Sequence, residues 1–481
     1  MKQWVLPGVS LGYILGVAVG SVVDYPSVSI LSLLLMAGIL SFWMAFRQAK
    51  VFLVLCSSVF MVTGMVLASR TVEHYQSLGE LSNVSGSGTV RGEMIPGTYT
   101  ARIVVTLDDC GATACPREAV QVEVDRFGSW ADGERVRIGP CDLKRPERFD
   151  PAFDYPLYLA KEGIGFVAKQ CPVALMDTEG SRWRYWLHRT RVFVGTAITD
   201  HLPEPEAGLA RGLVLGGNDE LPETVAKDFR TVGLSHIVAV SGYNLSALAG
   251  ALFVCGSMLG WYRKQAVWVT LIGIIVFVLL VGAPASAVRA ALMAIIGLGA
   301  LLASRPTRGI PILLVAAAVM LLFNPLLLRY DIGFQLSYMA TLAILLSTEW
   351  RAQFHVRSWI GEGLLETVLI TTVVLLFVTP LSLWHFGTLS PYALLANMLA
   401  LPLVPLAFLL AFLIVPLGWL PGIGTLCGWL AYGFLHSLVM VAESLAHFPW
   451  ATATYTDVSL LMLGCWYLFW IFFFTRSRIS Q

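Results

Sequence analysis

Long apolar runs, each of about the length that crosses a bilayer, constrain this chain more than any other feature. Three runs precede residue 70, nine follow residue 231, and a polar stretch separates the two groups. Because a bilayer core needs roughly 20 apolar residues per helix, the pattern predicts a mainly α, polytopic membrane bundle of about 12 spans. The runs are 4–23, 28–46, 51–69, 233–259, 265–283, 286–303, 310–324, 332–348, 364–386, 391–415, 422–446 and 457–475.

The composition agrees with a chain that is solvated by lipid. Charged residues make up 13% of the chain and hydrophobic residues 57%, whereas a soluble domain carries about 25% charged residues. The net charge of +1 neither favours nor excludes an acidic partner.

Basic residues in the short loops indicate the orientation, since they gather on the cytoplasmic side of membrane proteins. If the N-terminus is cytoplasmic, eleven such residues lie inside and only Arg329 lies in a short outer loop. This bias predicts an inner-membrane protein with both termini in the cytoplasm and the stretch 70–231 outside. The eleven are Lys2, Arg47, Lys50, Arg263, Lys264, Arg305, Arg308, Arg351, Arg357, Arg476 and Arg478.

The cysteines fit this orientation. Cys110, Cys115, Cys141 and Cys171 all lie in the outer stretch, and the other four lie in apolar runs. Four cysteines in an oxidising compartment predict two disulfides with three possible connectivities, of which we favour Cys110–Cys115 with Cys141–Cys171. A metal site is a weaker interpretation, because the four show no CxxC spacing and residues 75–180 contain no histidine.

Segment 84–175 alternates between apolar and polar residues, as half-buried strands do. Turn signals such as Ser85-Gly86, Ser87-Gly88 and Asp132-Gly133 separate or flank the alternating stretches. About five short strands predict a small barrel or sandwich, and an OB-like barrel is the leading interpretation. The clearest strands are read at 100–107, 119–127, 134–143 and 164–171.

The charge of the outer segment argues against a general surface for nucleic acid. Residues 71–181 hold 11 Lys and Arg against 17 Asp and Glu, a net charge of −6, whereas an electrostatic funnel for phosphates is basic. One local basic cluster is interpreted as a solvated strand edge, with a nucleic-acid contact as the alternative. It consists of Arg135, Arg137, Lys144, Arg145 and Arg148.

The stretch 181–198 mixes arginines with Trp183, Tyr185, Trp186 and Phe193. Aromatic and basic residues at helical spacing predict a helix that lies in the headgroup layer of the membrane. An aromatic and basic platform for single-stranded nucleic acid is the alternative.

Polar side chains interrupt the apolar runs, and such residues usually face a cavity or one another. His236, Ser241 and Asn244 lie in the run 233–259. They are candidates to line a channel, although polar contacts that merely hold helices together are an equal alternative.

Arg289 follows Pro284 among small residues and must meet an acidic group, carbonyls, water or a phosphate, unless it extends to the interface. Asp331, a candidate partner for Arg289, and Gln335 follow in the next polar stretch. Asn397 precedes two prolines that break the helix, as happens where a helix lines a cavity or packs on protein.

Motifs of several enzyme classes are absent from the sequence. No lysine follows a glycine, which excludes a Walker A loop, and no HxH or HExxH motif occurs. We therefore expect no enzymatic activity, no cofactor and no metal.

Several of these stretches, in this order, resemble the ComEC-type competence channel family. The resemblance covers nearly the whole chain; each motif is weak alone, but four in order are specific. One departure is Asn244, which stands where the family pattern often has a histidine. The four stretches of the core are 210–242, 288–293, 331–341 and 389–405, and 153–166 with the N-terminal spans resembles the N-terminal part of the family.

The resemblance implies passage of single-stranded DNA across the cytoplasmic membrane during natural transformation. It implies as partners a cytoplasmic ATPase or another pulling factor, a separate nuclease and DNA-receptor proteins, with a homo-oligomer left open. Many members carry a C-terminal metallo-β-lactamase-like domain, and this chain is expected to be a short form without it.

Two other functions stay open: a transporter or flippase for another polymer or solute, and a non-transporting assembly scaffold. The predicted domains are N-terminal transmembrane helices (1–69), an extracytoplasmic OB-like β-domain (70–180), amphipathic interfacial helices (181–231), a channel bundle (232–475) and a cytoplasmic tail (476–481).

Overall fold

The computed structural model describes most of the chain, which divides into two compact units. The first unit comprises residues 1–192 and 314–331, and the second comprises 193–313 and 332–481. The predicted span 28–46 lies outside the described residues. These are 2–22, 49–97, 99–110, 115–128, 130–149, 153–169, 171–176, 181–217, 221–238, 240–304, 308–351, 359–455 and 458–479.

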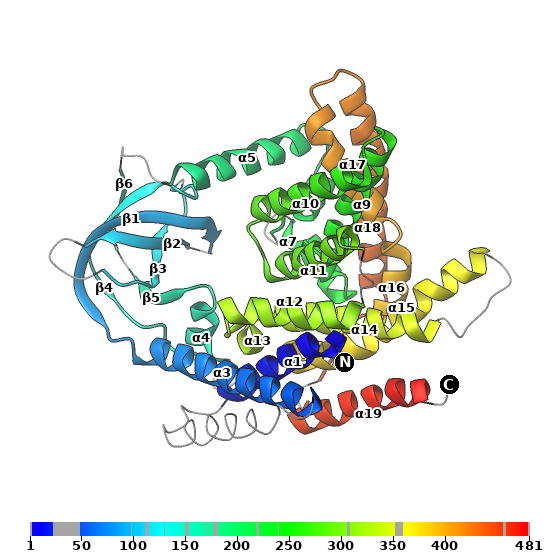
Figure 1. Cartoon of the computed structure of the whole chain (residues 1–481). Helices are drawn as coiled ribbons and strands as arrows, with labels where there is room; N and C mark the ends of the chain where they lie inside the picture. The colour runs from blue at the N-terminus through cyan, green and yellow to red at the C-terminus, as the bar shows by residue number, and fades with distance from the viewer. Residues whose placement is uncertain are drawn as a thin grey trace. The chain divides into compact units, whose positions relative to one another are not determined.

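The first unit combines a small β-sheet with helices (Figure 1). The boundary between the units falls inside α5 (Arg182–Thr199) and inside α12 (Gly309–Phe323). The other elements of the first unit are α1 (Lys2–Gly20), α3 (Ala49–Ser77), β1 (Leu81–Pro96), β2 (Thr100–Asp109), β3 (Ala119–Asp125), β4 (Arg135–Leu143), α4 (Tyr155–Ala160), β5 (Ile164–Ala168), β6 (Val173–Leu175) and α13 (Leu327–Tyr330).

The second unit is helical apart from a short two-stranded ribbon. Its elements are α6 (Glu206–Leu215), α7 (Glu223–Thr231), α8 (Ser235–Val238), α9 (Gly242–Met258), α10 (Arg263–Leu280), α11 (Ala285–Leu302), α14 (Ile332–Arg351), α15 (Trp359–Phe386), β7 (Thr388–Leu389), α16 (Ala393–Ala400), α17 (Val404–Leu417), α18 (Ile423–Ala446), β8 (Ala453–Thr454) and α19 (Leu460–Ile479).

The strands form where the sequence alternates. In β2 the buried residues Ala101, Ile103 and Val105 alternate with more exposed neighbours, because successive side chains of a strand point to opposite faces. The buried residues of β1–β5 form a single apolar core, which includes Cys110, Cys141 and Cys171. The predicted strands at 100–107, 119–127, 134–143 and 164–171 are confirmed to within a few residues.

The strand order is β5-β3-β2-β1-β4-β6, with β3 and β5 parallel and the other pairs antiparallel. Lys144, directly after β4, forms an antiparallel bridge with Val167 of β5, with N···O distances of 3.0 and 2.8 Å. Because β4 and β5 stand far apart in the strand order, this bridge closes β1–β5 into a barrel, around which the long β1 bends (Figure 1).

Ser85-Gly86 and Ser87-Gly88 lie inside β1, so the prediction that they form turns is wrong. β1 pairs with β2 on one side and β4 on the other, and its register shifts next to these glycines. A Cβ atom on Gly88 would lie 2.3 Å from the backbone oxygen of Thr106. Glycine here serves a bulged, bent strand rather than a turn.

The four outer cysteines form two disulfides, Cys110–Cys115 and Cys141–Cys171, which is the connectivity favoured from the sequence. The first closes a loop of five residues and the second spans 30. The second joins β4 to the segment after β5, and therefore fastens the barrel where Lys144 and Val167 also meet.

Several of the predicted spans are present as helices. Among the described residues, four helices are long and apolar enough to cross a membrane, or five if the bent pair α16 and α17 is one span. Shorter apolar helices are Leu6–Gly20, Gly242–Met258, Gly309–Phe323, Ile332–Ser347 and Leu461–Trp470.

Two of the apolar runs are interrupted. α16 and α17 meet at a bend of 48° next to Pro402, as predicted, because proline lacks the N–H that a continuous helix needs. The run 233–259, expected as one span, is instead divided into α8 and α9. The hydroxyl oxygen of Ser241 accepts a hydrogen bond from the amide of Asn244 and so begins a new helix.

Candidate functional site

Arg289 lies in the first turns of α11, inside the second unit. The helix begins directly after Pro284, and small residues such as Ala287 and Ala290 leave room beside it. Only 7% of the Arg289 surface is exposed. A buried guanidinium needs acceptors for its N–H groups, since burying a charge without them is costly.

The guanidinium of Arg289 is held by α14. Its Nη1 donates to the backbone oxygen of Ser337 and to the hydroxyl of Thr341, one turn further on. Its central carbon lies 5.8 Å from the ring centroid of Tyr338, within cation–π range. Its Nε has no hydrogen-bond partner among the described residues. Arg289 thus joins α11 to α14 and retains an unused donor.

The start of α9 lies against the same guanidinium. A Cβ atom on Gly242 would lie 2.7 Å from Nη2 of Arg289, so this position has no room for a side chain unless Arg289 moves. Ser241 caps the helix, and Asn244, 1% exposed, donates to the backbone oxygen of Leu213 at 3.2 Å. The structure therefore brings Ser241, Asn244 and Arg289 together.

Two other polar residues of the second unit that were singled out from the sequence, Gln335 and Asn397, form hydrogen bonds with groups other than Arg289. Gln335 Oε1 lies 2.7 Å from Nε2 of His385. Asn397 donates to the backbone oxygen of Ala393 at 2.8 Å, within its own helix, and His236 is exposed on α8. That these side chains line a channel stays a prediction.

Asp331 belongs to the first unit, where its carboxylate lies 3.1 Å from Nζ of Lys161. The Lys161 and Asp331 side chains are 10% and 15% exposed, and the backbone oxygen of Lys161 accepts a hydrogen bond from Asn324 at 2.7 Å. The structure thus gives Arg289 and Asp331 partners other than the pairing suggested from the sequence. The Lys161–Asp331 ion pair fastens α4 to the segment around α13.

Lys161→Met is expected to lower the free energy of unfolding of the first unit by about 2–3 kcal/mol, because it removes the ammonium that lies 3.1 Å from the largely buried Asp331 carboxylate. The measurement is thermal unfolding of the purified full chain in detergent. Arg148→Ala serves as the control, since Arg148 is 53% exposed in its ion pair with Asp154 and such a pair contributes less than about 1 kcal/mol. Equal stabilities of Lys161→Met and the wild type would contradict the role of this pair.

A contact between Glu206 and His436 in the second unit was not predicted from the sequence. Glu206, whose side chain is 4% exposed, lies 2.7 Å from Nδ1 of His436 on α18. The available signal was an acidic residue at the start of the mainly apolar helix α6. Its partner could not be identified, because the two residues are 230 positions apart.

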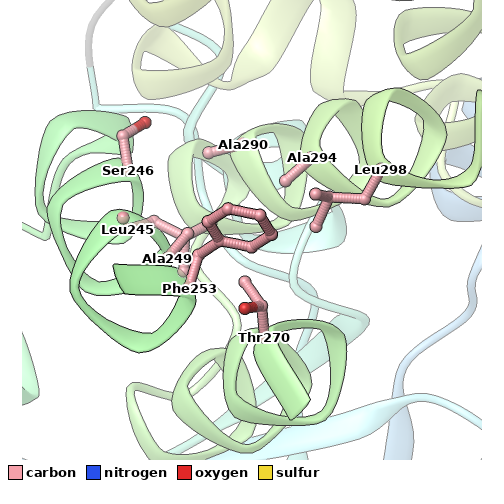
Figure 2. Close-up of a pocket in the computed structure, with 9 residues that line it drawn as sticks. Leu245, Ser246, Ala249, Phe253, Thr270, Ala290, Ala294 and Leu298 are labelled. Carbon is pink, nitrogen blue, oxygen red and sulfur yellow. The ribbon is translucent and has the colours of Figure 1, made fainter. Parts of the chain in front are cut away.

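A cavity of about 330 Å³ lies between α9, α10 and α11 in the second unit (Figure 2). Its walls are mostly apolar. The hydroxyls of Ser246 and Thr270 both donate to the backbone of their own helices. Ser246 and Ala290 lie toward one end of this cavity and Thr270 toward the other (Figure 2). The remaining lining residues are Leu245, Ala249, Gly250, Phe253, Ala294 and Leu298.

The chemistry that this region offers is positive charge and hydrogen-bond donation. The described residues contain no group of three His, Cys, Asp or Glu side chains placed to hold a metal ion. Arg289 and the amides at the start of α9 are donors, so the arrangement suits an anion.

Comparison with known proteins places the region around Arg289 in a family. Residues 213–478 match the family model described as Competence protein. The chain belongs to this competence protein family. The match begins in α6 and includes α9, α11 and α14, so every residue that contacts Arg289 lies in the part shared with the family.

One curated relative of this family is ComE operon protein 3 of Bacillus subtilis (strain 168), 28% identical over 251 residues. The matched region is 52% of this chain and 31% of the relative, so the chain spans about a third of that protein's length. No solved structure matches the chain.

Proposed function

We propose that this chain is a membrane channel that passes single-stranded DNA across the cytoplasmic membrane during natural transformation. The observation that carries the proposal is a buried cation, Arg289, within the family-matched helical region. It lies beside a helix start and keeps one N–H without an acceptor among the described residues. A passing phosphodiester group supplies the acceptor that this donor lacks.

Transport into the cell needs an energy source outside this chain. A DNA strand carries one negative charge per nucleotide, and moving a charge against the membrane potential costs about 2.3 kcal/mol per 100 mV. The sequence contains no Walker A loop. We therefore propose a cytoplasmic ATPase or other pulling factor as partner, together with a nuclease and DNA-receptor proteins.

We place the chain in the inner membrane with about 12 spans and both termini inside. The exposed aromatic residues at the two ends of α18 support a transmembrane position for this helix. α18 has 24 residues, about 36 Å of helix, and Trp419 and Trp450, 76% and 85% exposed, flank it. Tryptophan is enriched at membrane–water interfaces.

We propose that the barrel is OB-like and extracytoplasmic. Five strands close in the order β1-β2-β3-β5-β4, with β3 parallel to β5, which is compatible with a five-stranded Greek-key barrel. The two disulfides favour an oxidising compartment, and therefore the outer side of the membrane.

α5 is proposed to lie in the headgroup layer. One exposed face of this helix carries Trp183, Trp186, Arg189 and Phe193, a pattern typical of interfacial helices. The test attaches a spin label to a cysteine at position 186, in a chain that has no other free cysteine and is embedded in nanodiscs. This label should be more accessible to oxygen, which dissolves in the membrane, than to a water-soluble relaxation agent. A label at position 100, on an exposed strand residue, should show the reverse. Equal accessibility of the two sites to the water-soluble relaxation agent would exclude the interfacial position.

We expect no nuclease activity from the chain itself. The sequence contains no HxH or HExxH motif, so nothing local in it resembles a site for metal-assisted hydrolysis. Purified protein incubated with labelled DNA and Mg²⁺, Mn²⁺ or Zn²⁺ should leave the DNA intact. Cleavage that co-purifies with the chain and disappears in a point variant of it would contradict this expectation.

The function is tested by labelled DNA in a deletion strain. The deletion strain should still bind DNA at the cell surface but should contain no nuclease-resistant label in the cytoplasm. A plasmid copy of the gene should restore uptake. Normal internalisation in the deletion strain would exclude the proposed role.

A second candidate is a transporter or flippase for another polymer or solute. The net charge of −6 over residues 71–181 favours it, since an acidic outer segment does not attract a polyanion. Normal DNA uptake in the deletion strain, combined with altered export or flipping of another cargo, would support this candidate.

A further inference from the structure

The first turn of α9 and the side chain of Arg289 meet at a point where two positive charges face each other. The start of a helix carries roughly half a positive charge. Nη2 of Arg289 lies toward Gly242, the first residue of α9. A full and a partial positive charge at such short range repel each other, unless an anion lies between them.

Other contacts hold these two elements together despite the repulsion. The hydroxyl of Ser286, in the first turn of α11, donates to the backbone oxygen of Val240 at 2.9 Å. Nη1 of Arg289 is fixed on α14. Among the described residues Arg289 forms no ion pair with a carboxylate. The juxtaposition is therefore built by packing and hydrogen bonds, and its charge is not neutralised by a described acid.

Unused donors remain at this point. Nε of Arg289 has no partner in the described part of the chain, although 93% of the residue surface is buried. Ser241 accepts the amide of Asn244, whereas the amides of Gly242 and Tyr243 have no acceptor within the helix. Guanidinium and helix-start amides are the donors that bind phosphate oxygens in proteins.

The cavity lies close to this point and is lined by residues adjacent to Arg289 and Gly242 rather than by these two themselves. Ala290, next to Arg289, and Ser246, one turn after Gly242, both line it and lie toward the same end of it (Figure 2). The hydroxyl of Ser246 donates to the backbone oxygen of Gly242 at 2.9 Å, so one side chain of the cavity wall contacts the first residue of α9.

We propose that Arg289 and the first turn of α9 form a binding site for one phosphate-type oxyanion. This inference rests on the proposed function, because it assigns the phosphodiester groups of the translocating strand as the ligands that occupy the site in turn. Gly242 is the specificity-determining position, because a Cβ atom there would lie 2.7 Å from Nη2 and displace the guanidinium from the helix start.

The test uses the purified full chain in phosphatidylcholine nanodiscs and a fluorescent twelve-residue oligothymidylate, with binding followed by anisotropy. Arg289→Gln and Gly242→Ala should each weaken binding by about tenfold or more, as expected for loss of a charge-assisted hydrogen bond. Arg263→Gln, at the exposed start of α10, should bind as the wild type does. Arg289→Lys retains the charge and should bind better than Arg289→Gln.

Competitors and lipids identify the source of the oxyanion. Inorganic phosphate should displace the oligonucleotide from the wild type and not alter the residual binding of Arg289→Gln, and a methylphosphonate oligonucleotide should bind the wild type weakly. If nanodiscs with phosphatidylglycerol abolish this competition, a lipid phosphate occupies the site and the assignment to DNA is overturned.

Wild-type binding by both Arg289→Gln and Gly242→Ala would overturn the site itself. That result combined with loss of DNA uptake in the deletion strain would leave the channel function standing without this site. Phosphate-sensitive binding combined with normal uptake in the deletion strain would instead reject the proposed function and keep the site.

Discussion

Arg289→Ala should reduce the DNA taken into the cytoplasm by about 10- to 100-fold, at a matched amount of protein in the membrane. A hydrogen bond to a charged group contributes about 1.5–3 kcal/mol, and each 1.4 kcal/mol corresponds to a factor of about ten. Insertion should remain normal, because removing a charge from a span lowers its insertion cost. The measurement is nuclease-resistant labelled DNA per cell.

Arg289→Lys separates charge from geometry. The lysine ammonium carries the charge but lacks the planar guanidinium that can donate to two oxygens at once. Partial uptake by Arg289→Lys would indicate that the charge is sufficient. Uptake as low as that of Arg289→Ala would indicate that the guanidinium geometry is required. Arg263→Ala is the matched control, since it removes an exposed cation at the start of α10. Wild-type uptake by Arg289→Ala would exclude Arg289 from the path.

Removal of the Cys141–Cys171 disulfide should lower the free energy of unfolding of the barrel by about 2–5 kcal/mol, the usual effect in a small domain. This disulfide spans 30 residues and connects β4 to the segment after β5, so its loss frees the two strands that close the barrel. The double variant Cys141→Ser, Cys171→Ser, treated with protease over a temperature series, should lose the intact barrel fragment well below the wild-type temperature.

Removal of the Cys110–Cys115 disulfide should cost roughly 1.5 kcal/mol less, because the chain entropy gained on opening grows with the logarithm of loop length and this loop spans only five residues. Cys255→Ser, at an exposed free cysteine of the second unit, should not change the barrel. Equal protease resistance of all three variants would show that neither bridge stabilises the folded barrel.

The sequence predicted the elements whose structure is determined by neighbouring residues in the chain. The strand 100–107 follows from alternation, and the bend between α16 and α17 follows from Pro402. The division of the run 233–259 was not predicted, because the hydropathy of the run is continuous while Ser241 forms the cap. The Ser-Gly pairs of β1 resembled turns, since glycine favours turns and bulges alike, and only the pairing with β2 and β4 decides between them.

The partners of the candidate residues could not be predicted in the same way. Arg289 was identified because a cation among small apolar residues is unusual at any depth of a membrane. Its acceptors on Ser337 and Thr341 depend on how α11 packs on α14, and sequence spacing does not determine that packing. His385 was missed for the same reason, because its partner Gln335 lies 50 residues away.

The first unit is assembled from two stretches of chain, 1–192 and 314–331, with α6–α11 encoded between them. Lys161 leaves the ribosome 170 residues before Asp331, which at about 5–20 residues per second is a delay of roughly 10–30 s. During that interval the barrel has its own strands and cysteines, but Lys161 has no counter-ion from Asp331. The order of synthesis therefore differs from the order of assembly: the N-terminal unit is completed only after much of the family-matched region has been translated.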